Sequence, residues 1–268
     1  MRLLALSALL ATAGSMALAC PAPRVGGTEI YPTAAVLPAN LLRAYIYFPR
    51  AMARENIMGH VALLDASGTE VEGAFLSTRY TLWSQDRRRL TVLFDPGRVK
   101  TGLAAHDALG RALEEGKSYA LVVRGTALDA EECPLGQGVV QSFVAGPPDL
   151  APPAPETWDL ALPAQGSKAP LSLDLGTPHD HLSLAYRLRL LDADGAVVPG
   201  GIALAEGEQV WRFTPSEPWG DATYTLTIDP RLEDLAGNRP GILFDRPTGD
   251  VAPDAVLRLP VRPQAAPR

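Results

Sequence analysis

Residues 63–68 read LLDASG, and residues 190–195 repeat this stretch as LLDADG. Two further pairs of segments match in the same order: 92–96 (VLFDP) with 211–215 (WRFTP), and 119–123 (YALVV) with 224–228 (YTLTI). An acidic turn follows the last segment of each copy. Three matches in one order indicate a single domain type used twice. Because two copies of a small β unit usually present surfaces, the repeat lowers the expectation of an enzyme.

Each copy contains short β-forming segments separated by turn residues. In the first copy we expect strands at residues 41–48, 61–65, 69–73, 89–95, 118–125 and 139–144. In the second copy we expect strands at residues 171–175, 186–192, 209–214, 223–229 and 255–261. Turn signals every 8–12 residues are typical of β-sandwiches. The sequence therefore predicts an all-β protein of two tandem sandwiches.

Proline is dense in residues 146–155, and this composition favours an extended, semi-rigid spacer. We therefore expect an elongated rod, with each domain building its own core. The expected parts are a signal peptide (1–19), a tether (20–36), a first domain (37–146), a Pro-rich linker (147–156), a second domain (157–262) and a tail (263–268).

The N-terminus predicts export. A basic residue, Arg2, precedes an apolar stretch, and Ala17-Leu18-Ala19 forms a cleavage-type sequence directly before Cys20. Cys20 resembles the lipidated cysteine of bacterial lipoproteins, which would anchor the chain to a membrane. Two alternatives are a disulfide with Cys133 and an unpaired thiol. We expect an exported protein of the periplasm or outer surface, with the lipid anchor as one of its forms.

The charge pattern argues against nucleic acid as a partner. The 268-residue chain has a formal net charge of −6, and no basic stripe of the kind that nucleic acid requires is visible. The run Arg87-Arg88-Arg89 is the local exception. We interpret it as a solvated turn, because a strand follows it at once.

Residues 99–116 interrupt the repeat. Their apolar pattern predicts a short helix or compact loop inserted between two strands, and the second copy bridges the same gap with fewer residues. A loop present in only one copy is a candidate binding site, with Lys100, His106, Asp107 and Arg111 as its candidate residues. The alternative is a loop that packs over the end of the sandwich.

The end of the second copy, YTLTI at 224–228 followed by DLAGN at 234–238, resembles bacterial surface-layer-type immunoglobulin-like domains. In this turn Asp234 can accept backbone hydrogen bonds and Gly237 can supply a positive φ. In the first copy Asp129 matches Asp234, while Glu132 and Cys133 stand at the Gly237 and Asn238 positions. The resemblance implies two immunoglobulin-like sandwiches, over about residues 37–146 and 157–245, that serve as spacer or adhesion-like modules.

Few residues suggest chemistry. His179 and His181 would share a face on a strand and could bind a transition metal with further ligands, but no third ligand is evident nearby. The alternative is a polar loop. A Ser/His/Asp set could assemble from distant positions, although no nucleophile-elbow, zinc-protease or P-loop motif occurs.

Four tryptophans could form a platform for sugar rings. Trp211 lies on an expected strand and is expected in the core. Trp83 and Trp158 are further candidates, and Trp219, between Pro218 and Gly220, is the better candidate for an exposed aromatic side chain.

Taken together, these features favour an exported, non-enzymatic envelope protein that acts as a structural or protein-binding module and uses no cofactor. Its expected partner is an envelope protein or a cell-wall component. The alternatives are a pair of carbohydrate- or cell-wall-binding modules, and a metal-binding protein that uses His179 and His181.

The export prediction can be tested by mass spectrometry of the protein from its native envelope. We expect a chain that begins at Cys20. A diacyl or triacyl mass on Cys20 identifies lipidation, whereas a bond to Cys133 excludes it. A chain that retains Met1 contradicts export.

Overall fold

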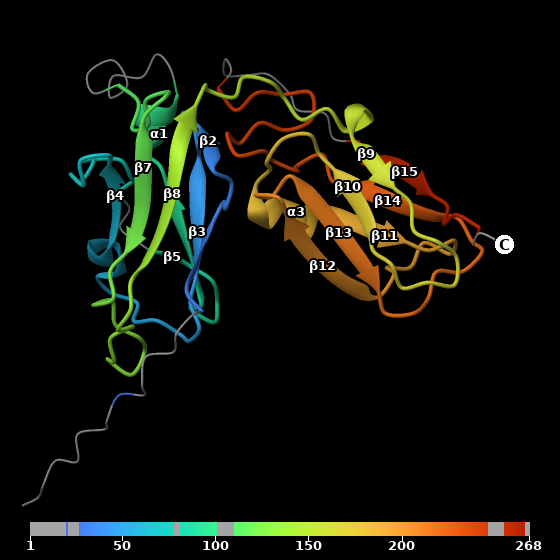
Figure 1. Cartoon of the computed structure of the whole chain (residues 1–268), viewed down its shortest axis with the longest axis horizontal. Helices are drawn as coiled ribbons and strands as arrows, with labels where there is room; N and C mark the ends of the chain where they lie inside the picture. Colours follow the sequence, from blue (N-terminus) through green and yellow to red (C-terminus); the bar gives the residue numbers. More distant parts are fainter. Residues whose placement is uncertain (1–19, 21–26, 78–80, 101–109, 246–254, 266–268) are drawn as a thin grey trace, which may run out of the picture.

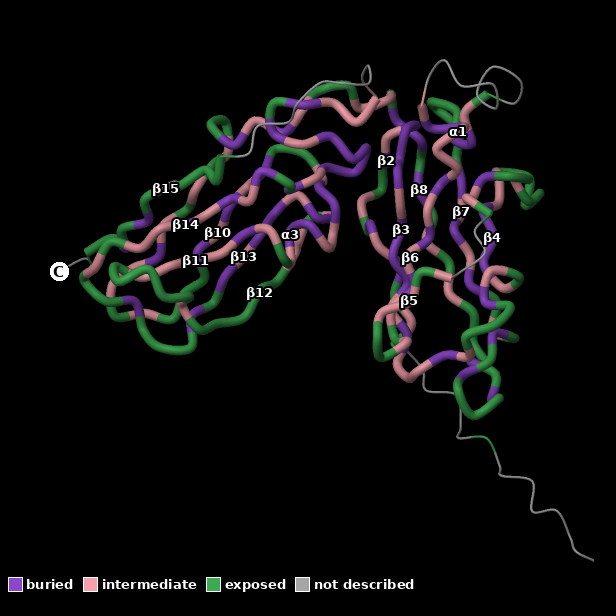
Figure 2. The backbone as a smooth tube through the Cα atoms, turned by 180° about the vertical axis from the view of Figure 1, so that it is seen from behind, coloured by how far each residue is buried: buried purple, intermediate pink, exposed green. Residues whose placement is uncertain are grey.

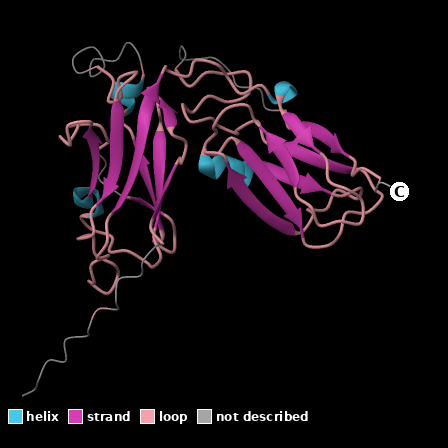
Figure 3. Ribbon diagram, viewed as in Figure 1, coloured by secondary structure: helices cyan, strands magenta, loops and turns pink. Residues whose placement is uncertain are grey.

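The computed structural model describes residues 20, 27–77, 81–100, 110–245 and 255–265. These residues form two immunoglobulin-like β-sandwiches, so the predicted all-β class is confirmed (Figures 1 and 3). The helical segments among the described residues are short: η1 (Ile57–His60), α1 (Pro96–Val99), η2 (Pro155–Thr157) and α3 (His181–Arg187). No helix within the described ranges is long and apolar enough to cross a membrane.

The first sandwich has two four-stranded sheets. One has the order β1 (Glu29–Tyr31), β3 (Arg43–Tyr47), β6 (Arg89–Leu93), β5 (Leu82–Trp83). The other has the order β2 (Val36–Pro38), β8 (Val139–Gly146), β7 (Ser118–Val123), β4 (Val61–Asp65). All pairings are antiparallel except that of β2 with β8, which is parallel.

The second sandwich has a four-stranded and a three-stranded sheet. The first has the order β12 (Gly200–Ala205), β13 (Val210–Pro215), β10 (Leu171–Asp174), β9 (Asp159–Ala161). The second has the order β11 (Leu188–Leu191), β14 (Tyr224–Ile228), β15 (Leu257–Val261). Four strands facing three in this connectivity correspond to the constant-type immunoglobulin arrangement.

The sequence repeat is also a repeat of hydrogen bonds. At the LLDASG turn, Oδ1 of Asp65 accepts bonds from the backbone N–H groups of Ser67 and Thr69. At the LLDADG turn, Oδ1 of Asp192 accepts the equivalent bonds, from Asp194 and Ala196. The two stretches therefore match because the same short polar side chain closes the same turn.

The acidic turns correspond in the same way. Oδ1 of Asp129 accepts bonds from the N–H groups two and four residues later, and so does Oδ1 of Asp234. Gly237 has φ 81°, and Glu132, at the matching position, has φ 62°. The expected positive φ of Gly237 is confirmed. A glutamate in this conformation is uncommon, because only glycine adopts it without a steric cost.

Each sandwich has its own hydrophobic core. The first is built from the inner faces of its two sheets and includes Ile46, Leu63, Leu90 and Leu121. The second includes Leu173, Leu190, Trp211 and Leu226. Along β6, β7, β10 and β11 buried residues alternate with less buried ones, as expected where a strand has one face on a core (Figure 2).

Three expectations about elements are wrong. The tether expected at residues 20–36 is wrong from residue 29 onward, because β1 and the first residue of β2 lie within it. The strand expected at 186–192 begins instead with the last turn of α3, because Asp180 caps a helix by accepting a bond from the N–H of Ser183. Residues 69–73 form no full strand; only an isolated bridge joins Glu70 to Leu64.

The elongated rod is also wrong, because the two sandwiches contact each other. Leu235 belongs to the second repeat but is 5% exposed within the core of the first sandwich. Its carbonyl accepts a bond from the N–H of Leu42. The linker does not hold the domains apart, since Asn40 of the first domain bonds both backbone groups of Asp149.

A disulfide joins Cys20 to Cys133, with their Cα atoms 5.5 Å apart. This is one of the two alternatives to lipidation of Cys20. A sulfur atom in a disulfide cannot also carry a thioether-linked lipid, so the two forms exclude each other. The mass measurement described above distinguishes them.

The position of Leu235 leads to a test. We expect Leu235→Ala to lower stability by about 2–4 kcal/mol, because a buried leucine is truncated. The loss of amide protection in hydrogen exchange should be greatest in β3 and β6 of the first domain. Leu232→Ala, in the core of the second domain, is the matched control and should affect β10 and β14. Loss confined to the second domain in both variants would show that Leu235 does not support the first core.

Candidate functional site

The densest group of polar and aromatic side chains lies where the two sandwiches meet. Along β3, Ala44 and Ile46 face the core, so Arg43, Tyr45 and Tyr47 face outward. The second sandwich covers this outer face. Tyr45 is only 2% exposed, which makes β3 a strand that is buried on both faces.

Arg43 is shared by two carboxylates of the second domain. Its Nε lies 3.5 Å from Oδ2 of Asp180, and its Nη2 bonds Oε2 of Glu233. Glu233 also accepts bonds from Arg239, at 2.6 and 2.9 Å. The side chains of Asp180 and Glu233 are only 4% and 12% exposed. The junction is therefore held by a partly buried ionic network rather than by apolar contact alone.

The hydroxyl of Tyr45 completes this network by donating a 2.7 Å hydrogen bond to Oδ2 of Asp180. Burial raises the pKa of the Asp180 carboxyl, although Arg43 opposes the shift. Burial also raises the pKa of Tyr45, and the charge of Asp180 adds to the effect. Tyr45 is therefore a hydrogen-bond donor at physiological pH.

His181 fills the other half of the junction. Its ring centroid lies 3.8 Å from that of Tyr31, and 5.6 Å from that of Tyr47. Its Nδ1 lies 3.6 Å from Oε1 of Glu208. Glu208, 2% exposed, also accepts bonds of 2.6 and 3.0 Å from the N–H and hydroxyl of Thr33.

In these contacts, side chains of one domain bond or pack against groups of the other domain. Asp180 and Glu208 have donors from the opposite domain, and the His181 side chain is 15% exposed. Such an arrangement fixes the position of one domain on the other. Sequence patterns gave no prediction of this junction. The one trace of it is that polar and apolar residues alternate only weakly over residues 41–48, whereas a strand with one face in solvent would carry polar residues on that face.

His179 and His181 do not share a face. His179 is 1% exposed, and its Nδ1 lies 2.9 Å from the carbonyl oxygen of Thr177, so Nδ1 carries the proton in the bonded tautomer. His181 begins α3 and points into the junction. Within the described ranges, no group of three or more His, Cys, Asp or Glu side chains is placed to hold a metal ion.

The candidate binding loop is only partly described. Nζ of Lys100 lies 4.3 Å from the ring centroid of Phe244, and Nη1 of Arg111 donates to the carbonyl of Val99. His106 and Asp107 lie outside the described residues. Binding at this loop stays a prediction, and the two described residues have contacts within the chain.

Arg98, which belongs to no sequence motif, holds the two ends of this loop together. It is 8% exposed, and its guanidinium donates to the carbonyl oxygens of Glu72, Gly110 and Arg111. Ala112 and Leu113 are buried in the first core. These contacts favour the alternative in which the segment packs over the end of the sandwich.

The tryptophans do not form a platform. Trp211 is fully buried, as expected. The expectation that Trp219 is exposed is wrong: it is 2% exposed, and its Nε1 donates to the carbonyl of Ala169. Trp83 and Trp158 are half-buried, and each packs against one of the two cores.

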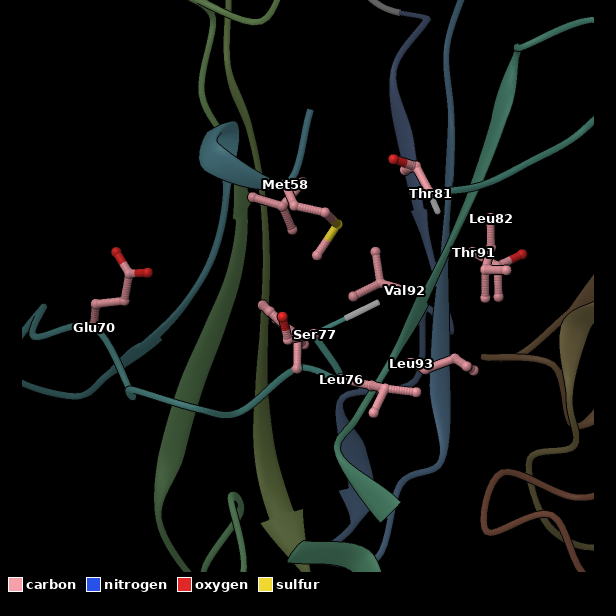
Figure 4. A pocket seen from close by; sticks show the side chains of 11 residues that line it. Met58, Glu70, Leu76, Ser77, Thr81, Leu82, Thr91, Val92 and Leu93 are labelled. Carbon is pink, nitrogen blue, oxygen red and sulfur yellow. The ribbon is translucent and has the colours of Figure 1, made fainter. Parts of the chain in front are cut away.

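A cavity of about 270 Å³ opens into the first sandwich near η1 (Figure 4). Its lining is mostly apolar, with three hydroxyls and the carboxylate of Glu70. The lining residues are Met58, Val61, Glu70, Phe75, Leu76, Ser77, Thr81, Leu82, Thr91, Val92 and Leu93. In Figure 4 Met58 and Val92 lie near its centre, whereas Glu70 lies to one side. Among the described lining residues, Glu70 is the one acidic or basic residue, so these side chains include no pair suited to acid–base chemistry.

A second hollow, of about 770 Å³, borders the junction. Its walls are the turn of the first domain that contains Arg88 and Arg89, and the helix α3 of the second. Its lining residues are Tyr47, Ser84, Gln85, Asp86, Arg88, Arg89 and Tyr186. Tyr186 is 58% exposed, so this hollow combines an accessible aromatic ring with two arginines and one aspartate.

Comparison with known proteins assigns the chain to no family. No protein-family model matches the chain, and no curated protein sequence matches it. One solved structure that resembles it is a mouse coronavirus receptor-binding domain complexed with its murine receptor, at 10% identity. The match covers 89% of this chain and 98% of that one, with a TM-score of 0.21. This value is too low to bear on fold or function.

His179 gives a pH-dependent prediction. Burial lowers its pKa from 6.5 to about 4, so the folded state binds this proton less readily than the unfolded state. Its contribution is present above pH 6.5 and is lost as the pH falls towards 4. We expect the free energy of unfolding to fall by about 3 kcal/mol through His179 as the pH is lowered over this range.

The matched variant is His179→Met, because Met52 occupies the equivalent bridge in the first domain. Asp234 acts in the opposite direction: burial and the charge of Asp149 raise its pKa to about 7, so its contribution falls as the pH rises from 4 to 7. At each pH the free energy of unfolding of the variant, measured by urea denaturation, is subtracted from that of the wild type. The difference gives the contribution of His179. A difference that does not change with pH would contradict the prediction.

Proposed function

We propose that the chain is an exported, non-enzymatic envelope protein whose two sandwiches act together as a structural and protein-binding module. The observation that supports this function is the junction between them. Arg43, Asp180 and Glu233 form an ionic network of low exposure, and Tyr45 adds a hydrogen bond to it. A fixed angle between two sandwiches suits a protein that presents one composite surface to a partner.

The envelope location rests on the N-terminal sequence and on the paired cysteines. Disulfides persist in oxidising compartments such as the periplasm and the cell surface. The Cys20–Cys133 bond is consistent with such a compartment.

A carbohydrate-binding function is the second candidate, and the hollow beside the junction favours it. Arg88 and Arg89 can donate paired hydrogen bonds to carboxylate or hydroxyl oxygens, and the exposed ring of Tyr186 offers a flat apolar surface with a polar end. A soluble acidic oligosaccharide that binds the wild-type chain and not Tyr186→Ala would favour this candidate.

The proposed function is tested by loosening the junction. We expect Arg43→Met to leave both sandwiches folded and to lower stability by about 2 kcal/mol, because Asp180 and Glu233 lose their shared cation while Arg43 is itself 23% exposed. Small-angle scattering should show a wider range of domain orientations. Binding of an envelope partner identified with the wild-type chain should weaken about tenfold, the equivalent of about 1.4 kcal/mol.

Arg187→Met is the matched control, because Arg187 pairs with Asp229 inside the second domain, at 3.1 Å. It should alter neither the scattering nor the binding. Equal partner binding by the Arg43 variant, once its domains are shown to be loosened, would contradict a role for the fixed junction.

A further inference from the structure

The free edges of the four sheets differ in how well they are protected. An edge strand exposes unpaired N–H and C=O groups, and proteins usually protect such edges by keeping them short, by covering them, or by placing charge or proline on them. Among the described strands, β1, β2, β5 and β9 have only two or three residues each. Short edges of this kind give a second chain little to pair with.

The longer edges are protected in other ways, with one exception. The free side of β4 is covered, because the N–H of Val71 donates to the carbonyl of Leu63. The free side of β11 is covered in the same way, because the N–H of Val198 donates to the carbonyl of Leu190. The edge strand β15 reads LRLPV and contains both a charge and a proline. The exception is β12.

The edge strand β12 has six residues, GGIALA, without charge or proline. Its first four residues are exposed, and the strand lies along the outer border of the second sandwich (Figure 2). Ile202 faces the same side as its neighbour Phe213, towards the core, and yet is 41% exposed. Nothing lies within 4 Å of a Cβ built on Gly201. Among the described strands β12 pairs with β13 on one side only, so the exposed stretch of its other side is free for another backbone, while α3 contacts part of the strand. The edge also leaves the core-facing side chain of Ile202 incompletely covered.

We propose that β12 is a self-association edge, which pairs antiparallel with β12 of a second copy about a two-fold axis. The pairing joins two four-stranded sheets into one continuous eight-stranded sheet. It supplies hydrogen-bond partners to both free edges at once and covers Ile202 in both copies.

Charge at the two ends of the strand supports a second copy as the occupant. Glu206 follows the last residue of β12; its side chain is 61% exposed and lies 3.4 Å from Nη2 of Arg212 on β13, so it remains accessible to a further cation. Lys168 lies near the first residue of the strand, because its Nζ bonds the carbonyl of Ser216, whose N–H donates to Pro199. Antiparallel pairing brings Glu206 of each copy towards Lys168 of the other. Parallel pairing would instead bring the two glutamates together.

This inference is independent of the proposed function, because it rests on the unpaired backbone of β12, whereas the proposed function rests on the ionic network of Arg43, Asp180 and Glu233. The test is sedimentation velocity of the full mature chain over a wide range of concentration. We expect a monomer at low concentration and twice that mass at high concentration, since a six-residue edge contact is at the small end of specific interfaces. Hydrogen exchange in β12 should slow as the dimer forms.

Two variants with matched charge identify the edge. Ala203→Lys places a charge on β12 and should keep the chain monomeric. Thr214→Lys adds the same charge to the same face one strand inward, on β13, where Thr214 is exposed, and it should dimerise like the wild type. A wild-type chain that stays monomeric at the highest concentration, or an Ala203→Lys variant that dimerises normally, overturns the proposal.

A charge exchange tests the direction of pairing. Lys168→Glu should weaken the dimer, because two glutamates then meet at each end. The double variant Lys168→Glu with Glu206→Lys should restore it. If Lys168→Glu leaves the dimer unchanged, the antiparallel arrangement is wrong.

Discussion

The arrangement of the molecule depends on one cation held between two carboxylates of another domain. Partial burial of the Arg43 guanidinium costs hydration energy, which its interactions with Asp180 and Glu233 offset. The two buried carboxylates are stabilised in turn by Arg43, by Arg239 and by the hydroxyl of Tyr45. The burial of each charged group in the network therefore depends on the presence of the oppositely charged group beside it. Because the groups come from both sandwiches, the network favours one orientation of the domains and disfavours slippage, which would leave a charge unpaired.

The apolar contacts around this network strengthen the same constraint. Leu235 reaches into the first core, and Leu42 packs beside the turn that carries Gly237. A Cβ on Gly237 would lie 2.5 Å from Cδ2 of Leu42, so this glycine serves both its own turn and the contact between domains. The second domain is a sandwich by itself in topology, yet part of its surface completes the first.

Much of the fold could be predicted because it depends on local chemistry. The LLDASG and LLDADG turns are closed by Asp65 and Asp192, and a side chain that bonds its own turn leaves a readable mark in sequence. The junction left almost no such mark, because the residues that meet there are more than 100 positions apart and each looks like an ordinary surface residue. Trp219 misled for a related reason: Pro218 and Gly220 suggest an exposed loop, but the indole is held by the distant carbonyl of Ala169. Whether residues 99–116 bind a partner depends on a surface that sequence patterns do not encode.

The divergence of the two copies also sets a limit on assembly. Docking of one sandwich on the next is a head-to-tail contact, and a contact of this type that both repeats could make would propagate into an open-ended filament. Each of the two surfaces that form this contact occurs in only one of the two copies. The first copy has Glu132 where docking needs Gly237, and β10, the counterpart of β3, directs Ser172 and Asp174 outward in place of Arg43 and Tyr45. Stacking through this contact therefore ends after two units, and the chain is a closed pair rather than the first segment of a fibre.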